Sequence, residues 1–196
     1  MGFLQGGTVV KFAFGRAGDQ PVLADFDHDG RDEPGVFRSG VWYLRSEASA
    51  GSAWRVFGYG AAGDVPLAGN WAGSGGIGVA VFRSGGWHLR NGLGGGTAHR
   101  VFSYGRSGDV PLVGDWLGDG IARPAVVRGA TWYFATSVRI PQTVWSFGYG
   151  WTEDSPVVAD HDGDGIETAG VTRGIQWFLR SDHSPTPDVT VIDFIG

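Results

Sequence analysis

The chain has 196 residues, a formal net charge of −5, a single lysine (Lys11) and no cysteine. The lack of cysteine excludes disulfides, thiol catalysis and thiolate metal sites. The acidic balance argues against a nucleic-acid partner, which needs a basic face, and no apolar run approaches the roughly 18 residues of a membrane-spanning helix.

The first part of the chain predicts short strands and no helix. We expect strands at 21–26, 34–38, 41–45 and 53–59, and Ser39-Gly40 indicates a tight hairpin between the second and the third. In the third strand, Trp42 and Leu44 share one face, whereas Tyr43 and Arg45 share the other. The 36 glycines and 9 tryptophans of the chain fit many short strands joined by glycine-rich turns.

An internal repeat then extends this pattern along the chain. The motif FAFG at Phe12 returns as FGYG at Phe57, FSYG at Phe102 and FGYG at Phe147, always after 45 residues. The copies cover approximately 12–56, 57–101, 102–146 and 147–191. Four antiparallel strands per repeat are typical of a propeller blade, so we expect one all-β domain over 1–196, a four-bladed β-propeller. A β-helix is the rival, but its coils are usually shorter.

One strand count leaves an alternative open. Strands of the FGYG type are expected at 9–14, 54–59, 99–104, 144–149 and, more weakly, 189–194, which makes five for four sets of the other strands. Either one terminal copy completes the ring from the opposite end of the chain, or the chain is a piece of a longer array.

Three residue types recur once per repeat and are expected to build the scaffold. An aspartate that caps a turn and an arginine that pairs with a carboxylate fit this role, and the tryptophans should be buried between blades. They are Asp19, Asp64, Asp109 and Asp154; Arg38, Arg83, Arg128 and Arg173; and Trp42, Trp87, Trp132 and Trp177.

Taken together, these motifs resemble the FG-GAP or VCBS-type repeats of secreted bacterial proteins, which are related to the propeller of integrin α-subunits. The resemblance covers nearly the whole chain. It implies a β-propeller, an extracellular location and calcium in loops of the D-x-D-x-D-G type. The residues after Met1 do not form a signal peptide, so the extracellular location rests on the resemblance alone.

Two loops have the acids that calcium needs. Alternating carboxylates around a glycine turn can converge on one ion, and the carbonyl at position 7 adds a ligand. The alternative is an acidic turn whose carboxylates lie in water. The candidate ligands are Asp25, Asp27, Asp29, Arg31 (carbonyl) and Glu33 in loop one, and Asp160, Asp162, Asp164, Ile166 (carbonyl) and Glu167 in loop four.

The other two loops have lost ligands. Loop three keeps Asp115 and Asp119 but has Leu117 at position 3 and Arg123 at position 9, so metal binding there stays open. Loop two begins at Asn70 and has no acid, and we expect no metal in it.

Position 2 of each loop carries a ring: Phe26, Trp71, Trp116 or His161. Aromatic faces stack on sugars, so Trp71 and Trp116 are the candidate ligand contacts, and packing between blades is the alternative. The loops between the third and fourth strands, which begin at Ser46, Asn91, Thr136 and Ser181, differ most and are where specificity usually lies.

Catalytic motifs are not recognised, so we expect no enzyme. The expected function is a non-catalytic extracellular recognition module with calcium-stabilised loops, whose partner is a glycan or a cell-surface protein. A purely structural calcium-binding module of a larger secreted protein is the first alternative, and a glycoside hydrolase-like enzyme is the second. The oligomeric state is left open.

Overall fold

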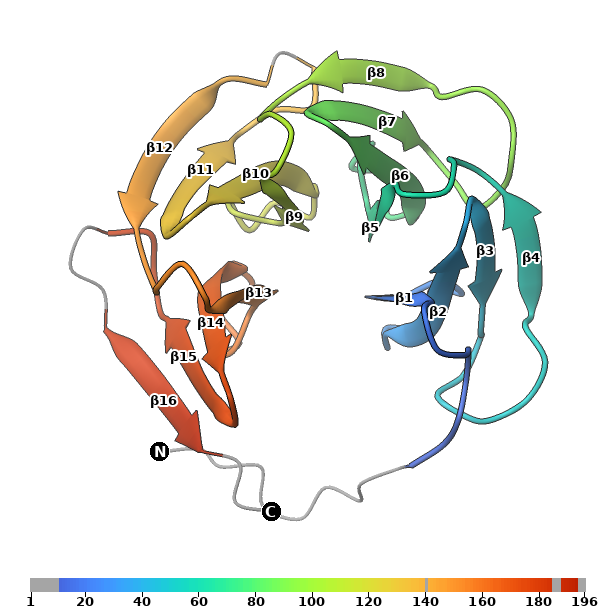
Figure 1. Cartoon of the computed structure of the whole chain (residues 1–196), viewed down its shortest axis with the longest axis horizontal. Coiled ribbons are helices and arrows are strands. Elements are labelled where there is room, and N and C mark those ends of the chain that lie inside the picture. Colours follow the sequence, from blue (N-terminus) through green and yellow to red (C-terminus); the bar gives the residue numbers. More distant parts are fainter. Residues whose placement is uncertain (1–10, 140, 185–187, 194–196) are drawn as a thin grey trace.

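The computed structural model describes residues 11–139, 141–184 and 188–193, and every helix or strand element in these ranges is a β-strand. The strands form four antiparallel sheets of four strands each, arranged as blades around a central axis (Figure 1). The predicted all-β, four-bladed propeller is therefore confirmed. No helix able to cross a membrane occurs in the described ranges.

Each blade consists of four strands that follow one another in the sequence. Blade 1 contains β1 (Gln20–Ala24), β2 (Glu33–Arg38), β3 (Val41–Leu44) and β4 (Arg55–Gly58). Blade 2 contains β5 (Val65–Gly69), β6 (Gly78–Arg83), β7 (Gly86–Arg90) and β8 (Arg100–Ser103). Blade 3 contains β9 (Val110–Gly114), β10 (Arg123–Arg128), β11 (Thr131–Ala135) and β12 (Thr143–Gly148). Blade 4 contains β13 (Ser155–Ala159), β14 (Thr168–Arg173), β15 (Gln176–Arg180) and β16 (Val189–Asp193).

The predicted hairpin at Ser39-Gly40 joins β2 to β3. Arg38 pairs with Val41, and the two residues between them have positive φ angles of 48° and 90°. Two successive positive φ angles define the type I′ turn, whose twist matches that of antiparallel strands. Glycine takes the second position at little steric cost, which explains the Ser-Gly pair.

The FGYG-type strands are the outermost strands of the blades. Blade 4 receives its outer strand from the C-terminal part of the chain, because β16 pairs with β15. At the other end, residues 11–14 form no strand, and the rest of the predicted strand at 9–14 lies outside the described residues. Within the described residues, blade 4 is therefore completed by residues 189–193.

Successive blades are joined by apolar seams. In the seam between blades 1 and 2, Trp42 is fully buried and packs edge-on against Phe37, with 5.4 Å between the ring centroids. Its indole N–H donates a hydrogen bond to the carbonyl of Tyr59 at 2.9 Å. The last glycine of the FGYG motif lies against the next blade: a Cβ on Gly60 would be 2.7 Å from Val81 Cγ1. Trp87 and Trp132 repeat the burial and the indole hydrogen bond in the next two seams.

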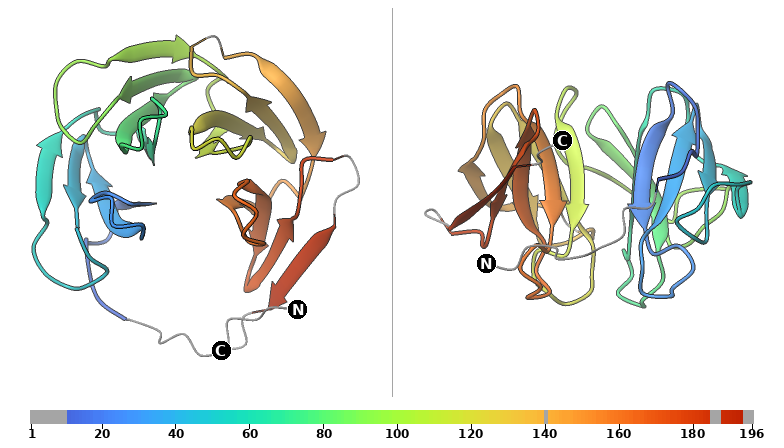
Figure 2. Two further views of the ribbon diagram at one scale, coloured as in Figure 1. Left: turned by 180° about the vertical axis from the view of Figure 1, so that it is seen from behind. Right: turned by 90° about the horizontal axis from the view of Figure 1, so that it is seen from below.

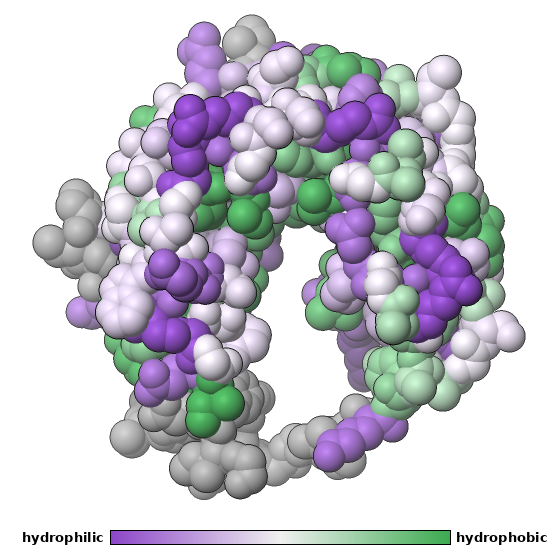
Figure 3. Space-filling view, in the orientation of Figure 1, coloured by the Kyte–Doolittle hydropathy of each residue, from purple (hydrophilic) through white to green (hydrophobic). Residues whose placement is uncertain are grey.

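The fourth side of the ring is different. Neighbouring blades touch through β1 and β5, β5 and β9, and β9 and β13, but the described residues of β13 and β1 make no comparable contact. Figures 1 and 2 show the described strands of blades 1 and 4 apart, and Figure 3 shows a hole at the centre of the ring. Trp177 is accordingly only partly buried. The expectation that all four tryptophans are buried between blades is therefore wrong for Trp177, because the described residues of blade 1 do not pack against this face of blade 4.

The repeated aspartates and arginines form one two-pronged ion pair per blade. Arg38 binds Asp19 through Nε–Oδ1 and Nη2–Oδ2, both at 2.7 Å, and Asp19 also accepts the backbone N–H of Arg16 at 2.9 Å. Each pair ties the turn before a blade to the β-hairpin of that blade, which confirms the scaffold role. The other pairs are Asp64–Arg83, Asp109–Arg128 and Asp154–Arg173.

These pairs make stability depend on pH in the acid range. The hydrogen bonds from Arg38 lower the pKa of Asp19 to about 2, and those from Arg173 lower the pKa of Asp154. A carboxylate with a lowered pKa stabilises the fold above its ordinary pKa, and this contribution is lost as the pH falls through the folded-state value.

The position of Trp177 predicts unequal effects of truncation. Trp87→Ala should reduce the free energy of unfolding by about 3–5 kcal/mol, because it leaves a cavity in a closed seam. Trp177→Ala should cost clearly less, since part of that ring already contacts solvent. Urea denaturation of the two variants measures both values, and equal losses would contradict the weaker packing of Trp177.

The ion pairs predict a change in acid unfolding. Asp154→Asn should melt at a lower temperature than the wild type at pH 7, and the two melting temperatures should converge between about pH 4 and pH 2. Glu153→Gln, an exposed neighbour, is the matched control and should follow the wild type. A constant difference across this pH range would show that the pair does not carry the effect.

Candidate functional site

All candidate ligands lie at one end of the blades. Because the strands are antiparallel, the β1–β2 and β3–β4 connections of blade 1 and their equivalents leave the same end, whereas the β2–β3 type hairpins leave the other. We call the end with the β1–β2 type loops (25–32, 70–77, 115–122 and 160–167) the loop rim. Figure 2 shows connections projecting from both ends of the ring.

Loop one brings its four predicted carboxylates together. One oxygen from each of Asp25, Asp27, Asp29 and Glu33 lies within 4.8 Å of the others. Asp25 accepts the backbone N–H of Asp29 at 3.0 Å, which closes the turn, and the buried Glu33 accepts that of Phe26 at 2.9 Å. Burial raises the pKa of Glu33. Four hard oxygen ligands at this spacing suit calcium, and the turn hydrogen bonds show that the loop also closes by itself.

Loop four assembles only part of its predicted set. Asp160, Asp162 and Asp164 each place an oxygen within 4.8 Å of the others. Glu167 points elsewhere: its Oε2 accepts the backbone N–H of Asp115 in blade 3 at 2.7 Å, and burial raises its pKa. Thr168 occupies the position equivalent to Glu33 and donates its hydroxyl to the carbonyl of Arg180 at 2.5 Å.

Loop three holds an arginine where loops one and four gather acids. Arg123 Nη1 contacts Asp119 Oδ1 at 2.7 Å, the carbonyl of Ile121 at 2.8 Å and Asp115 Oδ1 at 3.5 Å. These partners stand at loop positions 5, 7 and 1, the same positions that were predicted to ligate calcium in the other loops. The buried guanidinium therefore supplies a positive charge to this set of oxygens.

Loop two has no charged group in this place. Asn70 instead donates its side-chain N–H to the carbonyl of Gly120 in blade 3 at 2.6 Å. The loop contacts its neighbour directly.

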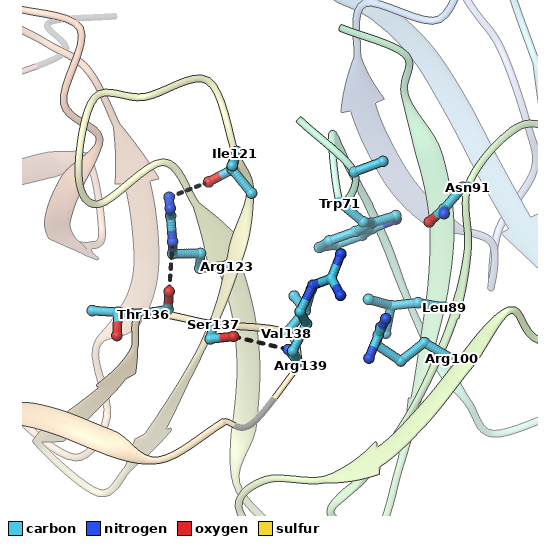
Figure 4. Close-up of a pocket in the computed structure, with 11 residues that line it drawn as sticks. Trp71, Leu89, Asn91, Arg100, Ile121, Arg123, Thr136, Ser137, Val138 and Arg139 are labelled. Atoms are coloured by element: carbon cyan, nitrogen blue, oxygen red, sulfur yellow. Dashed lines mark hydrogen bonds between the residues drawn. The ribbon is translucent and has the colours of Figure 1, made fainter. Parts of the chain in front are cut away.

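The seam between blades 2 and 3 opens at the loop rim into a cavity of about 260 Å³ (Figure 4). Its walls combine the aromatic ring of Trp71 with polar side chains that are able to form hydrogen bonds. The lining residues from blade 2 are Trp71, Ala72, Leu89, Asn91 and Arg100, and those from blade 3 are Ile121, Arg123, Thr136, Ser137, Val138 and Arg139.

The same cavity recurs one repeat earlier, between blades 1 and 2, with a volume of about 370 Å³. Phe26, Arg55 and Leu93 there are the repeat equivalents of Trp71, Arg100 and Val138. These inter-blade pockets are therefore a property of the repeat, and sequence differences between copies change their walls.

The seam between blades 3 and 4 is filled by rings at the equivalent place. His183, the repeat equivalent of Val138, lies 5.2 Å from Phe134 and 5.4 Å from Trp145 between ring centroids. Burial lowers the pKa of His183, so the ring is held in its neutral form to lower pH than an exposed histidine.

The two predicted ligand contacts lie deep in the seams. Trp71 is 5% exposed and Trp116 is 2% exposed, as expected from the packing alternative. Trp71 also forms a wall of the pocket, and its indole Nε1 has no hydrogen-bond partner among the described residues. Trp116 packs against Phe134, with 5.0 Å between ring centroids.

The pocket residues Asn91 and Arg139, from the β3–β4 type loops, and Arg100, at the start of β8, were not predicted individually. For Asn91 and Arg139, the only signal in the sequence was the variability of these loops between repeats.

No family model matches the sequence, and neither does any curated protein. Among solved structures, the chain is similar to a lectin of Agrocybe aegerita, described for its specific recognition of non-reducing terminal N-acetylglucosamine. The TM-score is 0.55 and the identity 17%, over 87% of this chain and 51% of that chain. What the two share is the fold. This chain spans about half the length of the solved chain that it matches.

Proposed function

We propose that the protein is a non-catalytic glycan-binding propeller whose sugar site is the pocket between blades 2 and 3. The observation that carries this proposal is the composition of the pocket, in which an aromatic wall faces several hydrogen-bonding side chains. Sugars present C–H faces for apolar contact and hydroxyls for polar groups, so this combination suits them. A volume of about 260 Å³ fits one sugar residue better than a long chain.

The similarity to a lectin supports this proposal at the level of the fold, on which many functions occur. We extend the proposal to membership of the FG-GAP or VCBS repeats, an extracellular location and a cell-surface partner. These three points rest on the repeat motifs. A glycosidase would need two carboxyl groups facing one cavity, roughly 5–10 Å apart. The lining of the pocket between blades 2 and 3 contains no acid, which favours binding over hydrolysis.

We further propose that loops one and four bind calcium, with Asp25, Asp27, Asp29 and Glu33 as the stronger set. Arg123 supports this proposal, because loop three has the same turn and contains a cation at the same loop positions. Without a cation, the carboxylates of loop one repel one another at short range. The Arg31 and Ile166 carbonyls would complete the two sites, by analogy with the Ile121 carbonyl.

The glycan proposal predicts selective loss of binding. Asn91→Ala removes an exposed amide that lines both this pocket and the one between blades 1 and 2, and Trp71→Phe, which changes this pocket alone, keeps a ring in the seam but removes the indole N–H. Each should weaken the binding of a glycan identified on an array by about threefold to tenfold, with a small change in melting temperature for Asn91→Ala. Glu153→Ala, in the linker between blades 3 and 4, is the control. Unchanged affinity in both pocket variants would overturn the proposed site.

The calcium proposal predicts a metal-dependent melting temperature. Calcium should raise the melting temperature of the EDTA-treated protein, because binding to the folded state alone stabilises it. Asp27→Ala and Asp162→Ala should each remove part of this shift, whereas Leu117→Ala, an exposed side chain in loop three, should leave it intact. Identical melting with and without millimolar calcium would refute the proposal.

A further inference from the structure

The pocket between blades 2 and 3 carries positive charge that the described residues do not neutralise. Its lining contains Arg100, Arg123 and Arg139 but no acidic residue. Arg123 is neutralised by Asp119, with Nη2–Oδ2 at 2.6 Å. The guanidinium groups of Arg100 and Arg139 form no ion pair with any described residue.

Two sets of repeated arginines in this chain serve the scaffold. One set pairs with the aspartates before each blade, as Arg38 does with Asp19. A second set holds the β3–β4 type loops through backbone carbonyls, as Arg90 does with the carbonyl of Thr97 at 2.5 Å. Arg100 and Arg139 belong to neither set, although both line a cavity in a protein with a net charge of −5.

The equivalent pocket between blades 1 and 2 provides an internal comparison. Arg55 replaces Arg100 there, and its guanidinium lies over the ring of Trp54, 4.4 Å from the centroid. Gly94 stands at the position of Arg139, and the acidic Asp27 replaces Ala72 in the lining. The excess of positive charge is therefore a property of the pocket between blades 2 and 3 and not of the repeat.

We infer that this pocket selects an anionic sugar residue, whose carboxylate or sulfate is bound by Arg100 and Arg139 while Trp71 and Asn91 contact the ring. This inference rests on the proposed glycan-binding function and names its ligand class. A guanidinium presents a planar set of donors that matches oxyanions, and a charge-assisted hydrogen bond is about twice as strong as a neutral one. Figure 4 shows that Arg100 comes from blade 2 and Arg139 from blade 3, and both line the pocket.

The test uses oligosaccharides that share one backbone and differ in one terminal residue: neutral, uronic acid or sulfate ester. The wild-type protein should bind at least one anionic form about tenfold more tightly than the neutral form, and the preference should shrink as salt is added. The uronic acid and sulfate forms show which oxyanion is preferred. The double variant R100Q/R139Q should bind neither anionic form more tightly than the neutral one.

Three controls test whether the anionic preference depends on Arg100 and Arg139 in a folded protein. R100K/R139K keeps the charge but loses the planar fork, so it should retain part of the preference. R55Q changes the equivalent arginine of the other pocket and should leave the preference unchanged. Melting temperatures show whether each variant is folded.

The outcomes separate this inference from the proposed function. Equal binding of all three oligosaccharides by the wild type would overturn the anionic preference and leave glycan binding intact. A preference that persists in folded R100Q/R139Q would place the selectivity outside this pocket. Binding of no glycan, neutral or anionic, would overturn both.

Discussion

The structure depends on burying the face of each blade against the next blade. A four-stranded sheet of this size has two faces, and an isolated blade would leave both in water. The tryptophan of the third strand supplies much of the apolar area on one face, as Trp42 does toward Val79 and Val81 of blade 2. The two-pronged pair of Asp64 and Arg83 fixes the turn between these blades. In blade 4, whose described residues do not pack against blade 1, Trp177 is only partly buried.

The loop rim shows how one turn can be stabilised in different electrostatic ways. In loop one, four carboxyl groups converge, and a cation would balance their charge. Loop three keeps two of the acids and balances them with Arg123 from its own chain. Loop two has lost the acids and uses Asn70 for a neutral contact with blade 3. A repeat can therefore lose its metal ligands without losing the turn, because the glycine at position 6 remains and takes a positive φ angle in every loop: Gly30, Gly75, Gly120 and Gly165.

The scaffold could be predicted from the repeated residues, but the lining of the pockets could not. Strand positions, the Asp19–Arg38 pairs and the burial of Trp42 follow from residues that recur every 45 positions. Which strand completes blade 4 did not follow, because both terminal segments resemble the motif. The orientation of the Glu167 side chain could not be predicted either, because its hydrogen-bond partner, the N–H of Asp115, lies 52 residues earlier in another blade. Each pocket likewise combines side chains from two repeats, and sequence patterns within one repeat cannot show it.

This arrangement explains how a regular scaffold can offer unlike binding sites. Each seam joins the β1–β2 type loop of one blade to the loops of the next, so a change in either repeat alters one pocket wall. Between blades 3 and 4, His183 packs among Phe134 and Trp145 in the place that Val138 takes between blades 2 and 3. Between blades 2 and 3, the β3–β4 type loop instead brings Arg139 to the rim. The rigid seams fix the positions of these walls, and the differences between repeats set their chemistry.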